Sequence, residues 1–146
     1  MATGEPKPLV LFVCTHNSAR SQIAEALLRA RYGDRLEARS AGTEPRGVHP
    51  GAVRAMAEVG IDPRGSRSKC VEAALADGDA DVVVTVCDHA RETCPWVPAR
   101  RMALHRSFED PSARPEDEQE EAFRRVRDEI AERIDRVAPG WVEAGS

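Results

Sequence analysis

Two short apolar runs constrain the fold of this chain more than any other feature of its sequence. Leu9–Val13 and Val82–Val86 are each five residues long, and polar side chains do not alternate along them. This pattern is typical of strands buried on both faces, as in a parallel sheet covered by helices. Leu36–Ser40 and Arg101–His105 are predicted as weaker strands, which gives a sheet of four.

Three helical segments are predicted to alternate with these strands. The first ends at Gly33, the second covers Pro50–Val59, and the third covers Glu116–Val137. Strands that alternate with helices imply an α/β fold of three layers, α/β/α, around the parallel sheet. The residues predicted to face the core are Ile23, Leu27 and Leu28, then Val53, Met56 and Ala57, then Phe123, Val126, Ile130, Ile134 and Val137.

Length and charge exclude several classes of protein. A chain of 146 residues fits one domain, expected to span residues 1–146 with a core over about 9–137. The net charge of −4 leaves no basic surplus for binding nucleic acid. No apolar run reaches the roughly 18 residues of a membrane span, and residues 1–8 lack the pattern of a secretory signal. We therefore expect a cytoplasmic protein that binds neither nucleic acid nor membrane.

A C-x5-R sequence follows the first apolar run, from Cys14 to Arg20. Such a loop can wrap successive backbone N–H groups around a tetrahedral oxyanion at the start of a helix. Residues 15–19 contain no proline, so every N–H group can donate, and a helical pattern follows. This sequence therefore predicts an oxyanion-binding loop.

The same spacing recurs from Cys94 to Arg100. Pro95 and Pro98 remove two donors from that stretch, and no helical pattern follows it. Because arginine is abundant in this chain, a chance match of this kind is common. We interpret the second occurrence as such a match.

The chemistry of an oxyanion loop assigns roles to its residues. Cys14 is the predicted nucleophile, because the N–H dipoles, the helix start and Arg20 all stabilise its thiolate. The planar guanidinium of Arg20 can hold two oxygens of the anion. Ser21 can hydrogen-bond the thiolate, and Asn17 can hold the loop's shape, since Asn tolerates left-handed backbone geometry. The predicted oxyanion-binding residues are Thr15, His16, Asn17, Ser18, Ala19, Arg20 and Ser21.

Attack on an oxyanion requires that a leaving oxygen be protonated, so a carboxylic acid is expected near the loop. Asp110 is the candidate, because Pro111 fixes the local turn and can aim the carboxylate. The alternative is an aspartate that only caps a turn. Glu109 is a weaker candidate for the acid.

A pair of cysteines follows the second apolar run, with Cys87 and Cys94 in a C-x6-C sequence. The pair is interpreted as two structural thiols, as a zinc site with His89 or His105, or as a thiol relay that serves Cys14. The relay is favoured, because the spacing matches no common zinc motif and the carboxyl ends of parallel strands meet at one edge. Cytosolic thiols do not indicate a structural disulfide framework.

These segments together resemble a known family. Cys14–Ser21, Val84–Pro95 and Phe108–Pro111 are similar to segments of the thioredoxin-coupled arsenate reductases, which have the low-molecular-weight protein tyrosine phosphatase fold. The resemblance extends over about residues 9–137. It implies a single catalytic domain for arsenic detoxification, with a redox-active disulfide. No cofactor is needed, because thiols supply the electrons.

The resemblance also implies a sequence of steps. Cys14 attacks arsenate while Asp110 assists the loss of water. Cys87 then attacks Cys14, which releases arsenite and leaves a Cys14–Cys87 disulfide. Cys94 attacks Cys87 and moves the disulfide to the surface, where thioredoxin reduces it.

The chain departs from the family in two places. His16 stands where several members have glycine, which leaves open a reductant other than thioredoxin, such as mycothiol with glutaredoxin-like partners. Some members bind potassium through an Asn, a Glu, a Ser and an Asp. Asn17, Glu25 and Ser40 match three of these, but Cys70 takes the fourth position, so a complete potassium site is not expected. Cys70 itself is interpreted as a small structural residue.

Two other functions remain open at this point. A phosphatase of the same fold would use the same loop, in which phosphate or sulfate can replace arsenate, but it would not need the C-x6-C pair. The residues after Pro111 are Ser112 and Ala113, not the tyrosines of the phosphatase branch, which argues against phosphotyrosine stacking. An arsenite- or metal-binding protein is the third interpretation.

Overall fold

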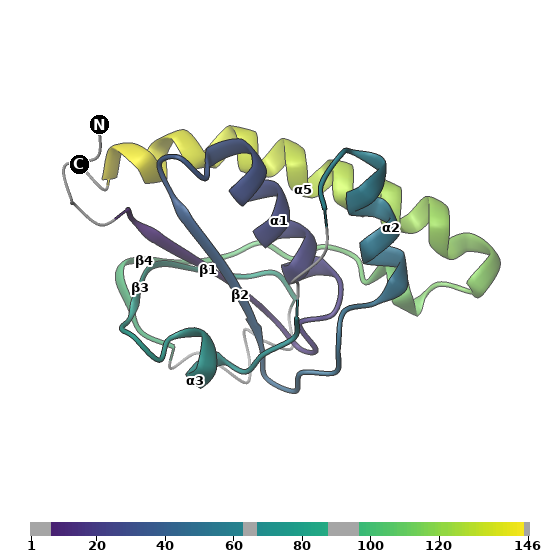
Figure 1. Ribbon diagram of the computed structural model, residues 1–146, viewed down its shortest axis with the longest axis horizontal. Helices are drawn as coiled ribbons and strands as arrows, with labels where there is room; N and C mark the ends of the chain where they lie inside the picture. Colours follow the sequence, from purple (N-terminus) through teal and green to yellow (C-terminus); the bar gives the residue numbers. More distant parts are fainter. Residues whose placement is uncertain (1–6, 63–66, 88–96, 145–146) are drawn as a thin grey trace.

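A four-stranded parallel sheet forms the centre of the computed structural model, which describes residues 7–62, 67–87 and 97–144 (Figure 1). The strands are β1 (Leu9–Cys14), β2 (Glu37–Gly42), β3 (Ala80–Thr85) and β4 (Ala99–His105). They are ordered β2-β1-β3-β4, and every neighbouring pair is parallel. The predicted sheet is therefore confirmed, and its two central strands are the two apolar runs.

Helices cover both faces of this sheet. α1 (Arg20–Tyr32) and α5 (Glu116–Ala144) lie together on one face, and α2 (Pro50–Glu58) packs beside α5 (Figure 1). The short α3 (Val71–Ala74) lies on the other face, where Arg39 of β2 donates to the carbonyl oxygen of Ala74. A 3-10 turn, η1 (Pro111–Ala113), precedes α5.

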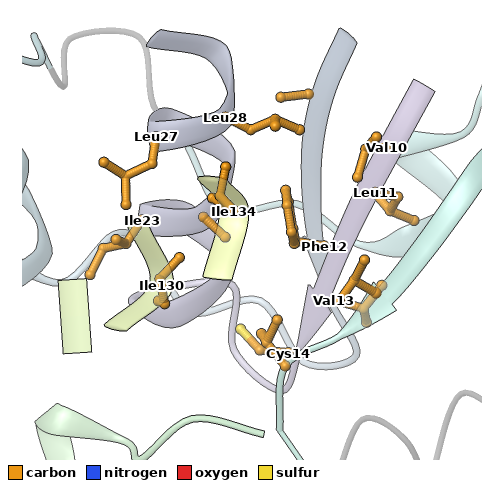
Figure 2. Packing of buried hydrophobic residues seen from close by; sticks show 14 of the residues in the cluster. Val10, Leu11, Phe12, Val13, Cys14, Ile23, Leu27, Leu28, Ile130 and Ile134 are labelled. Atoms are coloured by element: carbon orange, nitrogen blue, oxygen red, sulfur yellow. The ribbon is translucent and has the colours of Figure 1, made fainter. Parts of the chain in front are cut away.

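The core lies between β1 and the helices α1 and α5. Every residue of β1 is buried, and Figure 2 shows Phe12 on the same side of β1 as Ile23 of α1 and Ile134 of α5, with Leu11 and Val13 on the opposite side. Complete burial of each such side chain stabilises the fold by about 1.5–3 kcal/mol. Among the described residues, no helix is both long enough and apolar enough to cross a membrane.

The long C-terminal helix extends beyond its predicted end at Val137. It continues through Pro139, whose ring removes one backbone donor and crowds the carbonyl group four residues earlier. Ala138 and Trp141 are buried, and the Trp141 ring lies 6.3 Å from that of Phe12 between centroids. Burial of these two side chains offsets the cost of the proline, and the helix continues to Ala144.

The prediction for the second helix is right for Met56, which is fully buried, but wrong for the other two residues of its inward face. The buried residues of this helix include Ala52, Ala55 and Met56, whereas Val53 is half-buried and Ala57 is exposed. The cause is Gly51, where an added Cβ would lie only 2.5 Å from the Phe123 ring. The bare glycine backbone packs against this ring, which sets the rotation of α2.

Candidate active site

The C-x5-R sequence forms the turn between β1 and α1, which we call the anion loop (residues 14–20). Cys14 is the last residue of β1 and is 2% exposed, while Arg20 is the first residue of α1. The loop turns sharply at Asn17, whose φ is +49°. Asn is one of the few residues that adopts this left-handed conformation readily, as the sequence predicted.

The carbonyl groups of the anion loop point outward and are bonded. The carbonyl oxygens of Thr15, His16 and Ser18 accept hydrogen bonds from the backbone N–H groups of residues 44, 46 and 49, respectively. The backbone N–H groups of residues 15–19, in contrast, have no acceptor among the described residues. Successive backbone N–H groups without an acceptor, just before a helix start, are typical of a site for an anion.

Buried side chains brace the loop from behind. Asn17 donates to Ser21 Oγ at 2.8 Å, and Ser21 Oγ lies 2.7 Å from Cys14 Sγ. Asn17 and Ser21 are both fully buried. The hydroxyl of Ser21 is therefore held where it can donate to the Cys14 thiolate.

Arg20 connects the anion loop to the segment that contains Asp110. Its Nη1 donates to the carbonyl oxygen of Phe108 at 3.1 Å, and its Nη2 lies 3.7 Å from Asp110 Oδ2. Asp110 also caps η1, because its Oδ1 accepts from the backbone N–H and the hydroxyl of Ser112. The position of Asp110 is thus consistent with both predicted roles. Its Oδ1 caps the turn, and its Oδ2, on the side of Arg20, can act as the acid.

Glu109 lies on this same segment, which we call the acid segment (residues 108–114), but it is bound elsewhere. Its carboxylate pairs with Arg114 and with Arg125 of α5, the latter at 2.8 Å. Hydrogen bonds from these two guanidinium groups lower the pKa of Glu109 to about 2. Glu109 is therefore ionised at neutral pH, and its ion pair with Arg125 connects the acid segment to α5.

The second thiol lies at the rim of the anion loop. Thr15 Oγ1 is 3.4 Å from Cys87 Sγ, and Cys87 is 4% exposed. Cys87 is separated from β3 by Val86, whose N–H donates to the carbonyl oxygen of Val13 and keeps the chain beside β1. Cys87 therefore follows the strand by two residues, not directly as predicted.

The thiol relay also requires Cys94, and the zinc site requires His89 or His105. Cys94 and His89 lie outside the described residues. His105 is described, and its Nδ1 lies 2.7 Å from Thr85 Oγ1. Over the described ranges, no group of three or more His, Cys, Asp or Glu side chains could hold a metal ion.

The amino-acid pattern of residues 9–143 matches that of the low molecular weight phosphotyrosine protein phosphatase family. The chain belongs to this family. The matched residues include the anion loop between β1 and α1.

Similar proteins within the family include arsenate reductases. An arsenate reductase of Halalkalibacterium halodurans is 45% identical over 130 residues, which are 88% of this chain and 93% of that protein. An arsenate reductase solved in the phosphate-binding state has a TM-score of 0.78 and 34% identity, covering 95% of this chain and 99% of its own. The Corynebacterium glutamicum thioredoxin-dependent arsenate reductase has a TM-score of 0.69 and 29% identity, and the match covers 94% of this chain and 65% of that chain. The resemblance stated from the sequence is confirmed, while coupling of this chain to thioredoxin stays a prediction.

The potassium site of some family members is altered in this chain. Glu25 and Ser40 do lie together, since Ser40 Oγ donates to the Glu25 carboxylate. Cys70 does not join them, because it precedes α3 and pairs in a β-bridge with Gly42. Two basic side chains reach Glu25 instead: Lys69 Nζ lies 3.5 Å from Glu25 Oε1, and Arg29 Nη2 lies 2.5 Å from Glu25 Oε2. The Lys69 ammonium brings a positive charge to the carboxylate that would hold potassium, so these residues do not fit the ion.

Sequence reasoning missed three residues that support the loop. Gln22 donates to the backbone oxygen and to Oδ1 of Asn17, and Ser68 Oγ donates to the backbone oxygen. The backbone N–H of Lys69 donates to Asn17 Oδ1 at 2.9 Å. Gln22 alone carried a signal, as a polar residue beside the apolar face of the first helix. Ser68 and Lys69 are remote in sequence, and only the fold brings them to the loop.

Proposed function

We propose that this chain reduces arsenate to arsenite, with its own cysteine thiols as the source of two electrons. The contact between Thr15 and Cys87 carries the proposal. It puts a second buried thiol beside the anion loop, where hydrolysis of a phosphate ester has no use for one. The arsenate reductases that are similar over nearly the whole chain support the same conclusion.

The first step joins arsenic to the loop. Arsenate binds to the inward N–H groups of residues 15–19 and to the guanidinium of Arg20. The Cys14 thiolate, with Ser21 beside it, attacks arsenic, and one oxygen leaves as water after taking a proton from Asp110. A bond between Cys14 Sγ and arsenic(V) replaces one arsenic–oxygen bond, and no electrons have yet been transferred.

The second step is the reduction. The Cys87 thiolate attacks Cys14 Sγ, so that a disulfide bond forms and the sulfur–arsenic bond breaks. The electron pair of the broken bond stays on arsenic, which leaves as arsenite in the +3 state. Two thiols have lost two electrons in total, which balances the reduction of arsenic.

The remaining steps restore the thiols. Cys94 attacks Cys87 and releases Cys14, and the dithiol of a thioredoxin then reduces the Cys87–Cys94 disulfide. The similarity to a thioredoxin-dependent arsenate reductase supports this choice of reductant. The reactions belong to the cytoplasm, where thiols are kept reduced.

A coupled assay tests the function directly. The protein is mixed with arsenate, thioredoxin, thioredoxin reductase and NADPH, and each component is omitted in turn. We expect NADPH consumption that requires all of them and stops in Cys87→Ala. Cys70→Ala is the matched control and should retain full turnover, since Cys70 lies at the start of α3. NADPH consumption that is independent of arsenate would contradict the proposal.

Hydrolysis of phosphate esters is the second candidate, because the family is one of phosphatases. A phosphatase would hydrolyse p-nitrophenyl phosphate at the same rate in wild type and in Cys87→Ala, with no reductant. Turnover of arsenate with mycothiol and a glutaredoxin-like partner, but not with thioredoxin, would keep the reduction and change the reductant. A bound metal ion after purification would favour the metal-binding interpretation.

A further inference from the structure

Lys69 is an unusual residue in this chain. Only two of the 21 basic residues are lysines, Lys7 and Lys69, and all others are arginines. Lys7 is exposed and donates to the carbonyl oxygen of Gly33, at the C-terminal end of α1. Lys69 instead lies against the N-terminal half of α1, with its side chain 25% exposed.

The ammonium group of Lys69 lies among oxygens from separate parts of the fold. Its Nζ is 3.5 Å from Glu25 Oε1 and 3.4 Å from the carbonyl oxygen of Arg67. Glu25 Oε1 also accepts from Ser40 Oγ of β2, and its other oxygen accepts from Arg29. The Glu25 side chain is only 12% exposed, and Ser40 is fully buried. The Lys69 ammonium therefore contacts a carboxylate and a backbone carbonyl, and the same carboxylate also binds the Ser40 hydroxyl and the Arg29 guanidinium.

The backbone of Lys69 connects this cluster to the anion loop. Its N–H donates to Asn17 Oδ1 at 2.9 Å, and its carbonyl oxygen accepts from the N–H of Gly42. Asn17 in turn holds Ser21, which contacts Cys14. A displacement of Lys69 would therefore shift Asn17 and Ser21, and with them the hydrogen bond to Cys14 Sγ.

We propose that Lys69 is a built-in monovalent cation for the anion loop. Its ammonium group binds the Glu25 carboxylate, which fixes residues 67–69 against α1 and so positions Asn17. The lysine ammonium is a compact point charge with three donors, comparable in charge and size to a potassium ion. Arginine could not substitute, since its guanidinium is planar and larger. Lys69 is thus a positioning residue, and oxyanion binding and arsenate reduction in this chain are independent of potassium.

This inference deepens the proposed function. Of its measurements, only the one with arsenate rests on that function. The first readout is thermal unfolding, which does not depend on the reaction. Wild type, Lys69→Ala and the control Lys7→Ala are melted in potassium, ammonium, sodium or tetramethylammonium chloride at equal ionic strength. We expect wild type and Lys7→Ala to melt at the same temperature in all four salts. Lys69→Ala should melt about 3 °C lower in sodium and tetramethylammonium, and should recover in potassium and ammonium.

The second readout is the binding of inorganic phosphate, followed by the KM for arsenate. Lys69→Ala should bind phosphate more weakly in sodium and regain affinity in potassium, with KM following and kcat changing less. If arsenate is not reduced by any variant, the melting and phosphate results still decide the inference. If Lys69→Ala does not fold, Lys69→Gln takes its place. The melting temperature of the wild type in the four salts tests the inference in either case.

Two outcomes would overturn the inference. An equal loss of stability for the lysine variant in all four salts would make Lys69 an ordinary ion-pair partner. A potassium-dependent rise in the melting temperature or phosphate affinity of the wild type would show that the ammonium does not replace the ion.

Discussion

The anion loop and the acid segment meet at Arg20, but they are held in different ways. The anion loop is braced by hydrogen bonds among buried neutral groups, with Asn17 and Ser21 fully buried. The acid segment is anchored at the surface, where Glu109 pairs with Arg114 and Arg125. One half of the site is thus a rigid part of the core, and the other half is fixed by charge.

This difference predicts which half responds to the solvent. Buried neutral hydrogen bonds are little affected by salt or pH, whereas exposed ion pairs are screened by salt and lost when the carboxylate is protonated. The shape of the anion loop should therefore vary little with salt. The delivery of a proton by Asp110 should depend on ionic conditions.

The largest effect is expected at the nucleophile. Cys14→Ser keeps the shape of the anion loop, but a serine hydroxyl is barely ionised near neutral pH, so turnover should fall below detection. Phosphate should still bind, because the N–H groups of residues 15–19 are unchanged. Arsenate reduction at more than a few per cent of the wild-type rate would remove Cys14 from the chemistry.

The next effect is expected in the acid segment. Asp110→Asn keeps the cap on Ser112 but cannot donate the proton, so the rate of the first chemical step should fall about 100-fold. The affinity for phosphate should change little. Rapid-mixing single-turnover kinetics measure this step, and an unchanged rate would leave Asp110 as a turn residue only.

A smaller effect is expected from the brace of the anion loop. Asn17→Ala leaves the N–H of Lys69 without its acceptor and removes one of the acceptors of Gln22, so the free energy of unfolding should fall by about 2 kcal/mol. Asn17→Gly keeps the left-handed backbone without the side chain. A comparison of the two variants by urea unfolding separates the backbone strain from the lost bonds, and full stability of Asn17→Ala would contradict the role of Asn17.

The smallest effect is expected at Glu109. Glu109→Gln loosens the acid segment, so kcat should fall only about two- to threefold, and its sensitivity to salt should diminish. Glu58→Gln is the matched control, because Glu58 also has a pKa lowered to about 2 by two arginines, Arg124 and Arg127, but lies away from Asp110. An equal loss of kcat in both variants would contradict the anchoring role of Glu109.

The ion pairs of Glu109 with Arg114 and Arg125 also make the stability depend on pH. Because the pKa of Glu109 is lowered from 4.5 to about 2 in the folded state, its ion pairs stabilise the fold fully above pH 4.5. That contribution is lost as the pH falls from about 4.5 to 2. The melting temperature of the wild type should therefore decrease more steeply over this window than that of Glu109→Gln.

The sequence predicted what depends on local patterns. The apolar runs predicted β1 and β3, and the proline-free stretch after Cys14 predicted the loop between a strand and a helix. The ends of elements were less predictable, since α5 continues past Pro139 and buries Trp141 beside Phe12. No sequence pattern indicates burial of this kind.

The partners of the site residues were predicted least well. Lys69 reaches the loop from a segment remote in sequence, and Glu109 finds Arg125 on another element. Such contacts depend on how the helices pack around the sheet. Cys94 lies outside the described residues, so its role stays a prediction.

The most direct measurement is a single turnover in the variant Cys94→Ala, without any external reductant. The fully reduced variant is mixed with excess arsenate, and arsenite, free thiols and disulfide-linked peptides are quantified. One arsenite per chain should appear, two thiols should be lost, and mass spectrometry should identify a disulfide between Cys14 and Cys87. Formation of arsenite without that disulfide, or no arsenite at all, would contradict reduction by these two thiols.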